Sequence, residues 1–424
     1  MRYFGNSAWM FAEQMMKLIS AVFVGVYVAR YLGPFEYGVL TYSLAIVAAF
    51  MAASKLGMES ILVREIAKNP VNVREYMGTA FYLIFFATFG CFLILSAYVI
   101  FFEKSSQYQI YIWVISAGYF FQIGYVVDYA YQGKVKAKYS SIAKVLALIL
   151  SSILKIYLVF ISADLFLFVI AYVVDFFLIS FFLGLSWLIN DKIFFLSGFQ
   201  RRLVKPLLES AWPLVLSSVA ALLYMRTDQI MINKMLGSYD LGLYSAATRI
   251  YEAWIVIPFI ISISLLPAIV ALKKNKPEIY NYSLVKLFIL VFWPGVIVAI
   301  VSWCFGSEII NIVFGKAYSA ADGVFFIIMW TAPFVALGGM TTRYLTVENM
   351  EKKIANRTLL SLVVNIVLNF YLIPLYGIEG AATATLISTL LANYFIDYMD
   401  KDLKELRVIK NKALLLGAGS FFSK

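Results

Sequence analysis

Near the start of the chain stands Arg30-Tyr31-Leu32-Gly33-Pro34-Phe35-Glu36-Tyr37-Gly38, and 204 residues later stands Lys234-Met235-Leu236-Gly237-Ser238-Tyr239-Asp240-Leu241-Gly242. Both segments follow the order basic, any, Leu, Gly, any, any, acidic, any, Gly. The offset is close to half of the 424 residues. The repeat therefore predicts two halves of similar structure, each with a tight turn between two helices at this segment.

Apolar stretches long enough to cross a bilayer flank both segments. Hydrophobic residues make up 62% of the chain and charged residues only 14%, whereas a soluble domain carries about 25% charged residues. A helix needs about 20 residues to cross the hydrocarbon of a membrane. On that basis the sequence predicts twelve spans, at 9–32, 37–62, 77–102, 109–132, 139–161, 164–189, 208–235, 241–268, 283–305, 323–347, 355–374 and 378–398.

The repeat places six spans in each half. An even number keeps both halves the same way up, so an axis along the membrane normal should relate them. The expected fold is an all-α polytopic membrane protein with two six-helix lobes related by a pseudo-twofold. The expected parts are a first lobe at 1–190, an inter-lobe loop at 191–206, a second lobe at 207–398 and a basic tail at 399–424.

The charges of the loops predict the orientation in the membrane. With a cytoplasmic N-terminus, 23 lysines and arginines fall on the inner side and two, Lys104 and Lys316, on the outer side. This distribution follows the positive-inside rule at every loop and places both termini in the cytoplasm. The net charge of +11 is thus explained mostly by topology, and no nucleic-acid partner is expected.

Composition argues against several kinds of catalysis. The chain has no histidine and two cysteines, Cys91 and Cys304, both within predicted spans. This removes histidine-based metal sites and triads and leaves the cysteines as apolar packing residues. No glycine-rich phosphate loop ending in Lys-Ser or Lys-Thr occurs. We expect no catalytic residues, no metal site and no bound cofactor.

Cations lie within the apolar stretches themselves. Each costs about 2.5–3.5 kcal/mol at the centre of a bilayer, so such residues usually face a bundle interior or a watered cavity. Together they predict a membrane protein that handles an anion. The ten are Lys17, Arg30, Lys55, Lys144, Lys155, Arg226, Lys234, Arg249, Lys286 and Arg343.

Several of these cations have an acid at helical spacing. Lys17 lies four residues after Glu13, and Lys55 lies four residues before Glu59, which puts each pair on one face of a helix. These pairs could be self-neutralised and purely structural. Lys144 lies near the cytoplasmic end of its span, where it could instead snorkel to the membrane surface as an anchor.

Other cations are harder to explain as anchors. Arg226 lies near the middle of its span with Asp228 two positions on, and residues two apart on a helix address different neighbours. Arg249 has Glu252 three positions on. The next candidate pairs residues of two adjacent spans, Lys155 and Asp175.

The motifs, taken together, resemble a known family. They are Ala29 to Gly38, Tyr131-Gln132-Gly133, Arg226 to Ile232 with Gly242 to Ala247, and Asn365 to Asn369 with Ile373 to Thr385. In this order they look like the Wzx-type polysaccharide-biosynthesis flippases of the multidrug/oligosaccharidyl-lipid/polysaccharide (MOP) exporter superfamily. The resemblance covers the chain up to Asp400 and implies a MATE-like fold.

The resemblance implies a flippase of the bacterial inner membrane. Its substrate would be an undecaprenyl-pyrophosphate-linked oligosaccharide, moved to the periplasmic leaflet by alternating access for O-antigen or capsule assembly, beside other polysaccharide-assembly membrane proteins. Acids would couple transport to H+ or Na+ or balance the charge of an empty cavity. The residues expected to hold pyrophosphate and sugar are Arg226, Arg249, Arg30, Lys55 and Lys155, and the acids are Asp228, Glu252 and Asp175.

Three other functions remain open at the level of sequence. A lipid II flippase is the nearest, although its relatives usually have fourteen spans. A cation-coupled drug extruder of the same superfamily should carry more acids than bases in its cavity. A membrane-embedded glycosyltransferase or polymerase should have a large outer loop with catalytic acids, but the longest outer loop, at 306–322, is short.

Overall fold

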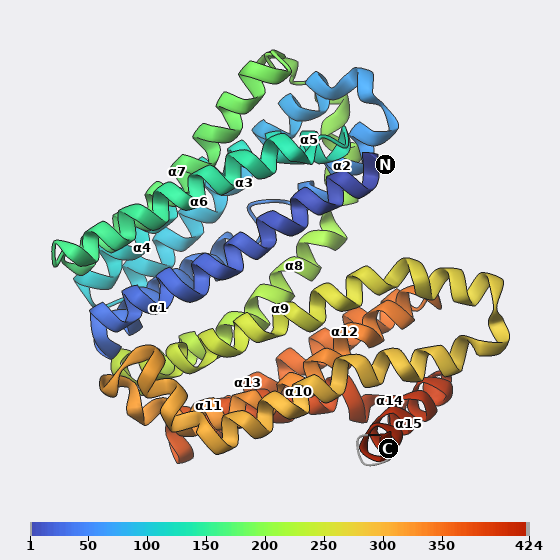
Figure 1. Cartoon of the computed structure of the whole chain (residues 1–424). Helices are drawn as coiled ribbons and strands as arrows, with labels where there is room; N and C mark the ends of the chain where they lie inside the picture. The colour runs from blue at the N-terminus through green and yellow to red at the C-terminus, as the bar shows by residue number, and fades with distance from the viewer. Residues whose placement is uncertain (1, 421–424) are drawn as a thin grey trace. The chain divides into compact units, whose positions relative to one another are not determined.

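The computed structural model describes residues 2–420, in which all regular structure is helical (Figure 1). The chain divides into two compact units, here called unit 1 (Met1–Leu32 and Val39–Arg226) and unit 2 (Gly33–Gly38 and Thr227–Lys424). The boundary falls within one helix, α8 (Arg201–Met235). The lobes expected at 1–190 and 207–398 and the loop at 191–206 stay predictions. The tail expected at 399–424 is described up to Ser420, and its last four residues lie outside the described range.

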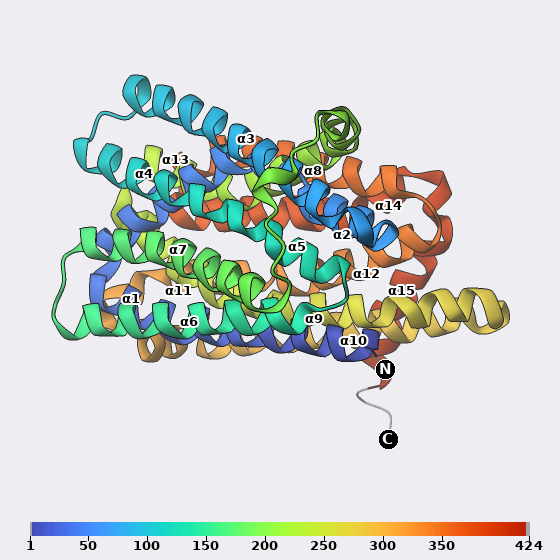
Figure 2. The ribbon, with the colours of Figure 1, turned by 90° about the horizontal axis from the view of Figure 1, so that it is seen from above.

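Unit 1 contains long helices joined by short turns. Ribbon views from two directions show α6 and α7 side by side (Figures 1 and 2), and Trp187 and Tyr131 are buried in the core of this unit. Asp164 begins α7, because its side chain accepts a hydrogen bond from the backbone N–H of Leu167 at 3.2 Å and so caps an otherwise apolar helix. The elements are α1 (Arg2–Met51), α2 (Met58–Lys68), η1 (Pro70–Asn72), α3 (Val73–Phe102), α4 (Ser106–Gly118), η2 (Tyr119–Tyr125), α5 (Val126–Gly133), α6 (Ala137–Phe160), α7 (Leu165–Asn190), η3 (Leu196–Gly198) and the first part of α8.

Unit 2 is built around α10, which packs against α9, α11, α12 and α15. Its core contains Phe288 on α10 and Leu337 and Met340 on α12, together with Leu406 and Ile409 on the C-terminal helix. The expected basic tail therefore folds into a helix that packs on this unit. The elements are the end of α8, α9 (Ser238–Asn275), α10 (Pro277–Phe314), η4 (Lys316–Ala321), α11 (Asp322–Met329), α12 (Ala332–Val347), α13 (Glu351–Leu390), η5 (Leu391–Phe395), α14 (Ile396–Met399), η6 (Lys401–Leu403) and α15 (Lys404–Ser420).

Two of the long helices are broken at a glycine. Among the described residues, ten helical stretches are long and apolar enough to cross a membrane, and two of these, Gly5–Met51 and Lys352–Met399, have 47 and 48 residues. The first contains Gly33 at φ 72°, ψ 171°, and the second contains Gly377 at φ 60°, ψ −141°. Each therefore consists of two spans, which agrees with the twelve expected from the sequence.

The two copies of the repeat adopt the same local structure and contact each other. Gly237 has φ 103° and ψ 179°, close to the values of its counterpart Gly33. A Cβ atom at Gly38 would collide with the carbonyl of Ser238, and a Cβ atom at Gly242 would collide with the carbonyl of Pro34. These two contacts join equivalent positions of the repeat, 34 with 242 and 238 with 38, so the contact has local twofold symmetry.

One predicted span ends earlier than expected. The span expected at 37–62 stops at Met51, and α2 begins at Met58 after a turn in which Leu56 and Gly57 have φ 51° and 60°. Left-handed residues cannot continue a right-handed helix. The expectation that Lys55 and Glu59 share one helix face is therefore wrong.

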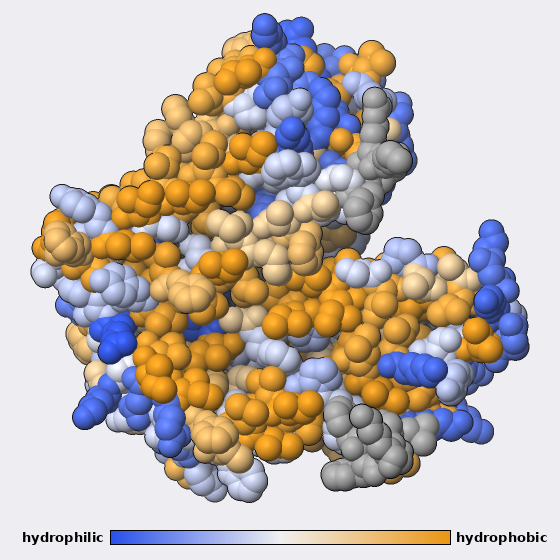
Figure 3. All heavy atoms as spheres, viewed as in Figure 1, coloured by the Kyte–Doolittle hydropathy of each residue, from blue (hydrophilic) through white to orange (hydrophobic). Residues whose placement is uncertain are grey.

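Apolar side chains cover most of the visible helix faces of each unit, and hydrophilic residues gather mainly at helix ends (Figure 3). Phe101 and Phe160, for example, are 79% and 85% exposed. Such surfaces are stable against lipid and costly in water. The described residues thus form a multi-pass membrane protein.

The break at Gly33 gives a prediction about stability. Gly33→Ala should lower the free energy of unfolding by about 1–3 kcal/mol, because this backbone region is essentially restricted to glycine. No atom lies within 4 Å of the added methyl group, so the cost comes from the backbone alone. The thermal unfolding midpoint in detergent measures it.

The matched control is Gly90→Ala in α3, where a methyl group also meets nothing within 4 Å and the backbone is helical. This control should unfold at or above the wild-type temperature, since alanine favours a helix over glycine. Equal midpoints for Gly33→Ala and wild type would show that the break carries no strain.

Candidate functional site

A buried ionic cluster joins three helices of unit 1. Lys144 on α6 contacts Glu13 on α1 at 2.9 Å and Asp128 on α5 at 2.8 Å. Glu13 also pairs with Lys17 at 2.6 Å and accepts a hydrogen bond from Ser141 at 2.9 Å. The side chains of Lys144, Glu13 and Asp128 are only 6–7% exposed.

The contacts of this cluster test two expectations from the sequence, the pairing of Glu13 with Lys17 and the role of Lys144 as a membrane anchor. The spacing of Glu13 and Lys17 correctly predicted an ion pair on one helix. Lys144 is not a snorkelling anchor, because two acids from other helices hold its ammonium group inside the unit. Two acids and two lysines balance each other's charge, so the cluster can be buried at moderate cost.

Lys155 and Asp175 form a second ion pair in unit 1, between α6 and α7. The sequence predicted this partnership. The ammonium group also lies 4.3 Å from the centre of the Tyr172 ring, a cation–π distance. The other carboxylate oxygen of Asp175 is buried and has no hydrogen-bond partner within the described residues, so the pair has an acceptor left for a further donor.

Lys55 differs from both of these lysines. It lies in the turn between α1 and α2 and is exposed, and its side chain forms no hydrogen bond or ion pair with any residue that the structure describes. Its ammonium group lies 5.3 Å from the centre of the Tyr125 ring. Lys17 and Glu59 are near enough to act on its charge through space. An aromatic face beside a lysine without an ion-pair partner suits an anion that carries a sugar.

Asp228 of unit 2 is held by neutral groups from three helical segments. One carboxylate oxygen accepts hydrogen bonds from the Tyr244 hydroxyl at 2.7 Å and the Thr385 hydroxyl at 2.6 Å. The other accepts from the Asn369 amide at 2.6 Å, and that amide also donates to Asn365 at 3.1 Å. Asp228 is 7% exposed and both asparagines are fully buried.

The break in α13 brings this cluster together. Asn365 and Asn369 precede Gly377 and Thr385 follows it, so the chain must turn back for both parts to reach Asp228. Within the described residues no cation lies within ion-pair distance of this carboxylate, and the carbonyl oxygen of Asn369 is buried without a hydrogen-bond partner. Carboxylate, amide and hydroxyl oxygens around one buried negative charge can accept a proton or a hard cation.

The remaining predicted residues lie on α1, α8 and α9. Arg226 is half-buried on α8 and close enough to Tyr119 to act on it electrostatically, while Asp228, two positions on, has the partners described above. As the sequence predicted, the two address different neighbours. Arg249 and Glu252 are half-buried on α9, and Arg30 is exposed on α1.

Sequence reasoning missed the neutral members of the Asp228 cluster and the acids that hold Lys144. Asn365, Asn369 and Thr385 appeared only in the family motifs, without a role. A signal for them was available, because asparagines four residues apart within an apolar span share one helix face and polar residues in membrane spans are usually functional.

Comparisons with solved structures define the class of protein. The fold is similar to that of the lipid II flippase MurJ in an inward closed conformation, with a TM-score of 0.69, 16% identity, and coverage of 98% of this chain and 92% of that chain. An inward-facing multidrug resistance MATE family transporter of the MOP superfamily gives a TM-score of 0.69 at 16% identity, over 94% and 95% of the two chains. The fold is thus that of MOP superfamily transporters and flippases.

Sequence comparisons give the family. The family described as polysaccharide biosynthesis protein matches residues 4–273, and the family described as MatE matches residues 213–371. The first match covers more than half of the 424 residues. The chain therefore belongs to the polysaccharide biosynthesis protein family, as its motifs predicted.

Two curated relatives agree with this family. A probable low-salt glycan biosynthesis flippase of Haloferax volcanii is 27% identical over 181 residues, which are 41% of this chain and 37% of that protein. The capsular polysaccharide biosynthesis protein CapF of Staphylococcus aureus is 26% identical over 192 residues, or 44% and 48% of the two chains. The match thus spans less than half the length of either relative.

The Lys155–Asp175 pair gives a prediction about the stability that is lost when a carboxylate is left without its cation. Lys155→Met should destabilise the protein by up to about 3–5 kcal/mol, because it leaves the largely buried Asp175, 19% exposed, without its cation. The double variant Lys155→Met/Asp175→Leu should recover most of this loss. Thermal unfolding of the two variants measures the difference.

The control for this prediction is Lys205→Met, which breaks an exposed pair with Glu209 at 3.9 Å and should change the midpoint little. If Lys155→Met is as stable as wild type, its ion pair is not part of the folded core. If the double variant is stable but transports nothing, Lys155 acts on substrate and not only on Asp175.

Proposed function

We propose that this protein is a flippase for a polyprenyl-pyrophosphate-linked oligosaccharide, in bacteria an undecaprenyl-pyrophosphate-linked repeat unit. It would carry this substrate from the cytoplasmic to the periplasmic leaflet of the inner membrane by alternating access, for O-antigen, capsule or a related surface polysaccharide. Both termini would be cytoplasmic, and the protein would transport its substrate without chemical change. Membership of the polysaccharide biosynthesis protein family supports this proposal.

The observation that carries the proposal is the environment of Lys55. Three other lysines of unit 1, Lys17, Lys144 and Lys155, are already neutralised by close acid partners, whereas Lys55 has no such partner among the described residues. A pyrophosphate bears negative charge that must be neutralised when its headgroup leaves water. We assign Lys55 to the pyrophosphate, and propose Arg226, Arg249 and Arg30 as further contacts to phosphate or sugar.

A flipping assay tests this function. Purified full-length protein in proteoliposomes should move a fluorescent polyprenyl-pyrophosphate oligosaccharide, scored by how much label is reached by a membrane-impermeant quencher. Lys55→Gln should reduce this rate by at least about tenfold, a loss of about 1.4 kcal/mol, and Lys55→Arg should keep part of it because the charge remains. Arg226→Lys should likewise keep part of the flipping rate, because the charge remains, and Arg226→Gln should lose most of it.

Lys104→Gln is the matched control, because Lys104 is an exposed lysine in a loop of the same unit and should have no effect on flipping. Lipid II and a drug cation are assayed in parallel. Transport of the drug cation alone would overturn the proposal in favour of an extruder, and a preference for lipid II would change the assigned substrate.

We propose that Asp228 binds the coupling ion, H+ or Na+, with Asn365, Asn369 and Thr385 as its other ligands. A single buried negative charge surrounded by oxygen atoms gains stability from one positive ion and loses it when the ion leaves. Glu252 and Asp175 are the other acids proposed for coupling. Asp175 is the weaker of these because it already forms an ion pair with Lys155.

Asp228→Asn tests this assignment, because it removes the charge and keeps the shape. The variant should flip substrate at least about tenfold more slowly and lose the response to an imposed ion gradient. A gradient of Na+ at constant pH and a gradient of pH without Na+ distinguish the two ions. Asp164→Asn, which keeps a good helix cap, should behave as wild type; a normal gradient response in Asp228→Asn would remove this residue from coupling.

A further inference from the structure

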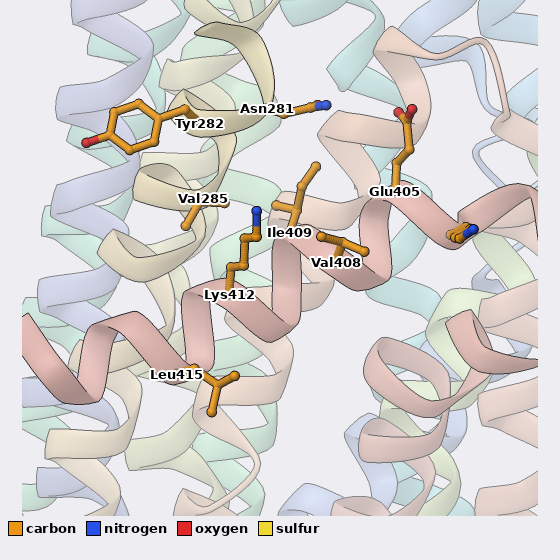
Figure 4. Close-up of a pocket in the computed structure, with 9 residues that line it drawn as sticks. Asn281, Tyr282, Val285, Glu405, Val408, Ile409, Lys412 and Leu415 are labelled. Atoms are coloured by element: carbon orange, nitrogen blue, oxygen red, sulfur yellow. The ribbon is translucent and has the colours of Figure 1, made fainter.

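The C-terminal helix forms one wall of a cavity in unit 2. The cavity lies between the start of α10 and α15 and has a volume of about 690 Å³ (Figure 4), a size typical of small-ligand sites. Val285 and Ile409 are among its apolar lining residues, and Lys404, Lys412 and Glu405 contribute charges. Figure 4 shows Lys412 extending from α15 toward the side of the cavity formed by α10.

Buried ionic contacts hold α15 in place. The ammonium group of Lys410, which is 1% exposed, donates to Asp397 at 2.7 Å and to the carbonyl of Asn393 at 2.7 Å. Arg357 pairs with the same carboxylate. Lys353 on α13 forms an ion pair at 2.6 Å with Asp400, which lies four residues before the start of α15. The wall of the cavity is therefore part of the folded unit.

The charges at the cavity favour an anion. The side chains of Lys404 and Lys412 are exposed and form no hydrogen bond or ion pair with any described residue. Lys286, one turn beyond Tyr282 on α10, lies over the ring of this tyrosine at 4.5 Å. Glu405 contributes one negative charge to the lining, so cations predominate.

The same cavity exposes apolar surface. Tyr282, Val408 and Leu415 are 62%, 46% and 74% exposed. An exposed apolar group beside an unpaired lysine is favourable when the occupant has both an anionic and a hydrocarbon part. Inorganic phosphate would satisfy only the lysines.

The length of α10 places this cavity near a membrane surface. The helix has 38 residues with a break at Phe305, and its first 28 residues alone are about 42 Å long, whereas the hydrocarbon core of a bilayer is about 30 Å thick. Asn281 and Tyr282 lie in its first two turns. They are therefore expected at the level of the lipid headgroups, where basic amphipathic helices bind anionic lipids.

We propose that the cavity between α10 and α15 binds the headgroup of an anionic membrane phospholipid. Lys404 and Lys412, two turns apart on α15, supply the positive charge around the headgroup, and the first carbons of an acyl chain lie against Tyr282, Val408 and Leu415. This site is separate from the residues assigned above to substrate and ion.

Lipid binding by the full-length protein tests the proposal. Purified protein in neutral detergent is titrated with short-chain phosphatidylglycerol or phosphatidylcholine, and bound lipid is counted by native mass spectrometry. Wild type should prefer phosphatidylglycerol. Lys404→Gln/Lys412→Gln should bind it about 30-fold more weakly, the loss expected when two lysines leave an anionic lipid surface.

The matched control is Lys104→Gln/Lys316→Gln, which removes two exposed lysines from other loops and should bind lipid as wild type does. A photoreactive residue in place of Asn281 should crosslink to phosphatidylglycerol. Unchanged binding by Lys404→Gln/Lys412→Gln, equal binding of phosphatidylcholine, or displacement by inorganic phosphate at lipid-like concentrations would each overturn the proposal. A crosslink to a second copy of the chain, or only to the lipid-linked sugar, would also overturn it. Because binding is measured without transport, the result is independent of the proposed flippase activity.

Discussion

The close contact between the two copies of the Leu-Gly repeat is the constraint on which much of this fold depends. Gly38 and Gly242 let the helix backbones approach so closely that a Cβ atom at either would collide with a carbonyl of the other copy. Gly33 and Gly237 supply the turns that precede these helices, with the same left-handed backbone. Only glycine satisfies both demands without strain. This geometric requirement explains why both copies of the repeat have glycine at these two positions.

A third glycine, Gly377, shapes the polar site of unit 2 through its backbone conformation. The break at Gly377 divides α13 and lets Asn369 and Thr385 reach the same carboxylate, Asp228. A continuous helix would carry residues 16 positions apart about 24 Å from each other. The ion site proposed here therefore depends on the backbone conformation of Gly377, in a helix that packs against α11.

The sequence predicted what depends on local spacing and missed what depends on tertiary contact. Apolar length and turn glycines correctly gave the number of spans, although the second ends at Met51 and not at residue 62. The ion pairs Glu13–Lys17 and Lys155–Asp175 followed from spacing or from adjacent spans. Lys55 was wrongly placed on a helix with Glu59, because no sequence pattern predicts that the backbone of Leu56 is left-handed. The partners of Lys144 come from helices far apart in the chain, and no periodicity encodes such contacts.

These contacts separate two kinds of charge that look alike in a sequence. Lys144 and Lys410 each lie against acids inside a unit and lock helices together, and burial lowers the pKa of Lys410, outside the spans, to about 8. Lys55 and Asp228 lack a close partner of opposite charge among the described residues. A structural charge is neutralised by the fold, so it gains nothing from a ligand. A charge that the fold leaves unbalanced is stabilised only when a ligand arrives, and this difference in free energy is what a transporter needs to respond to its substrate and ion.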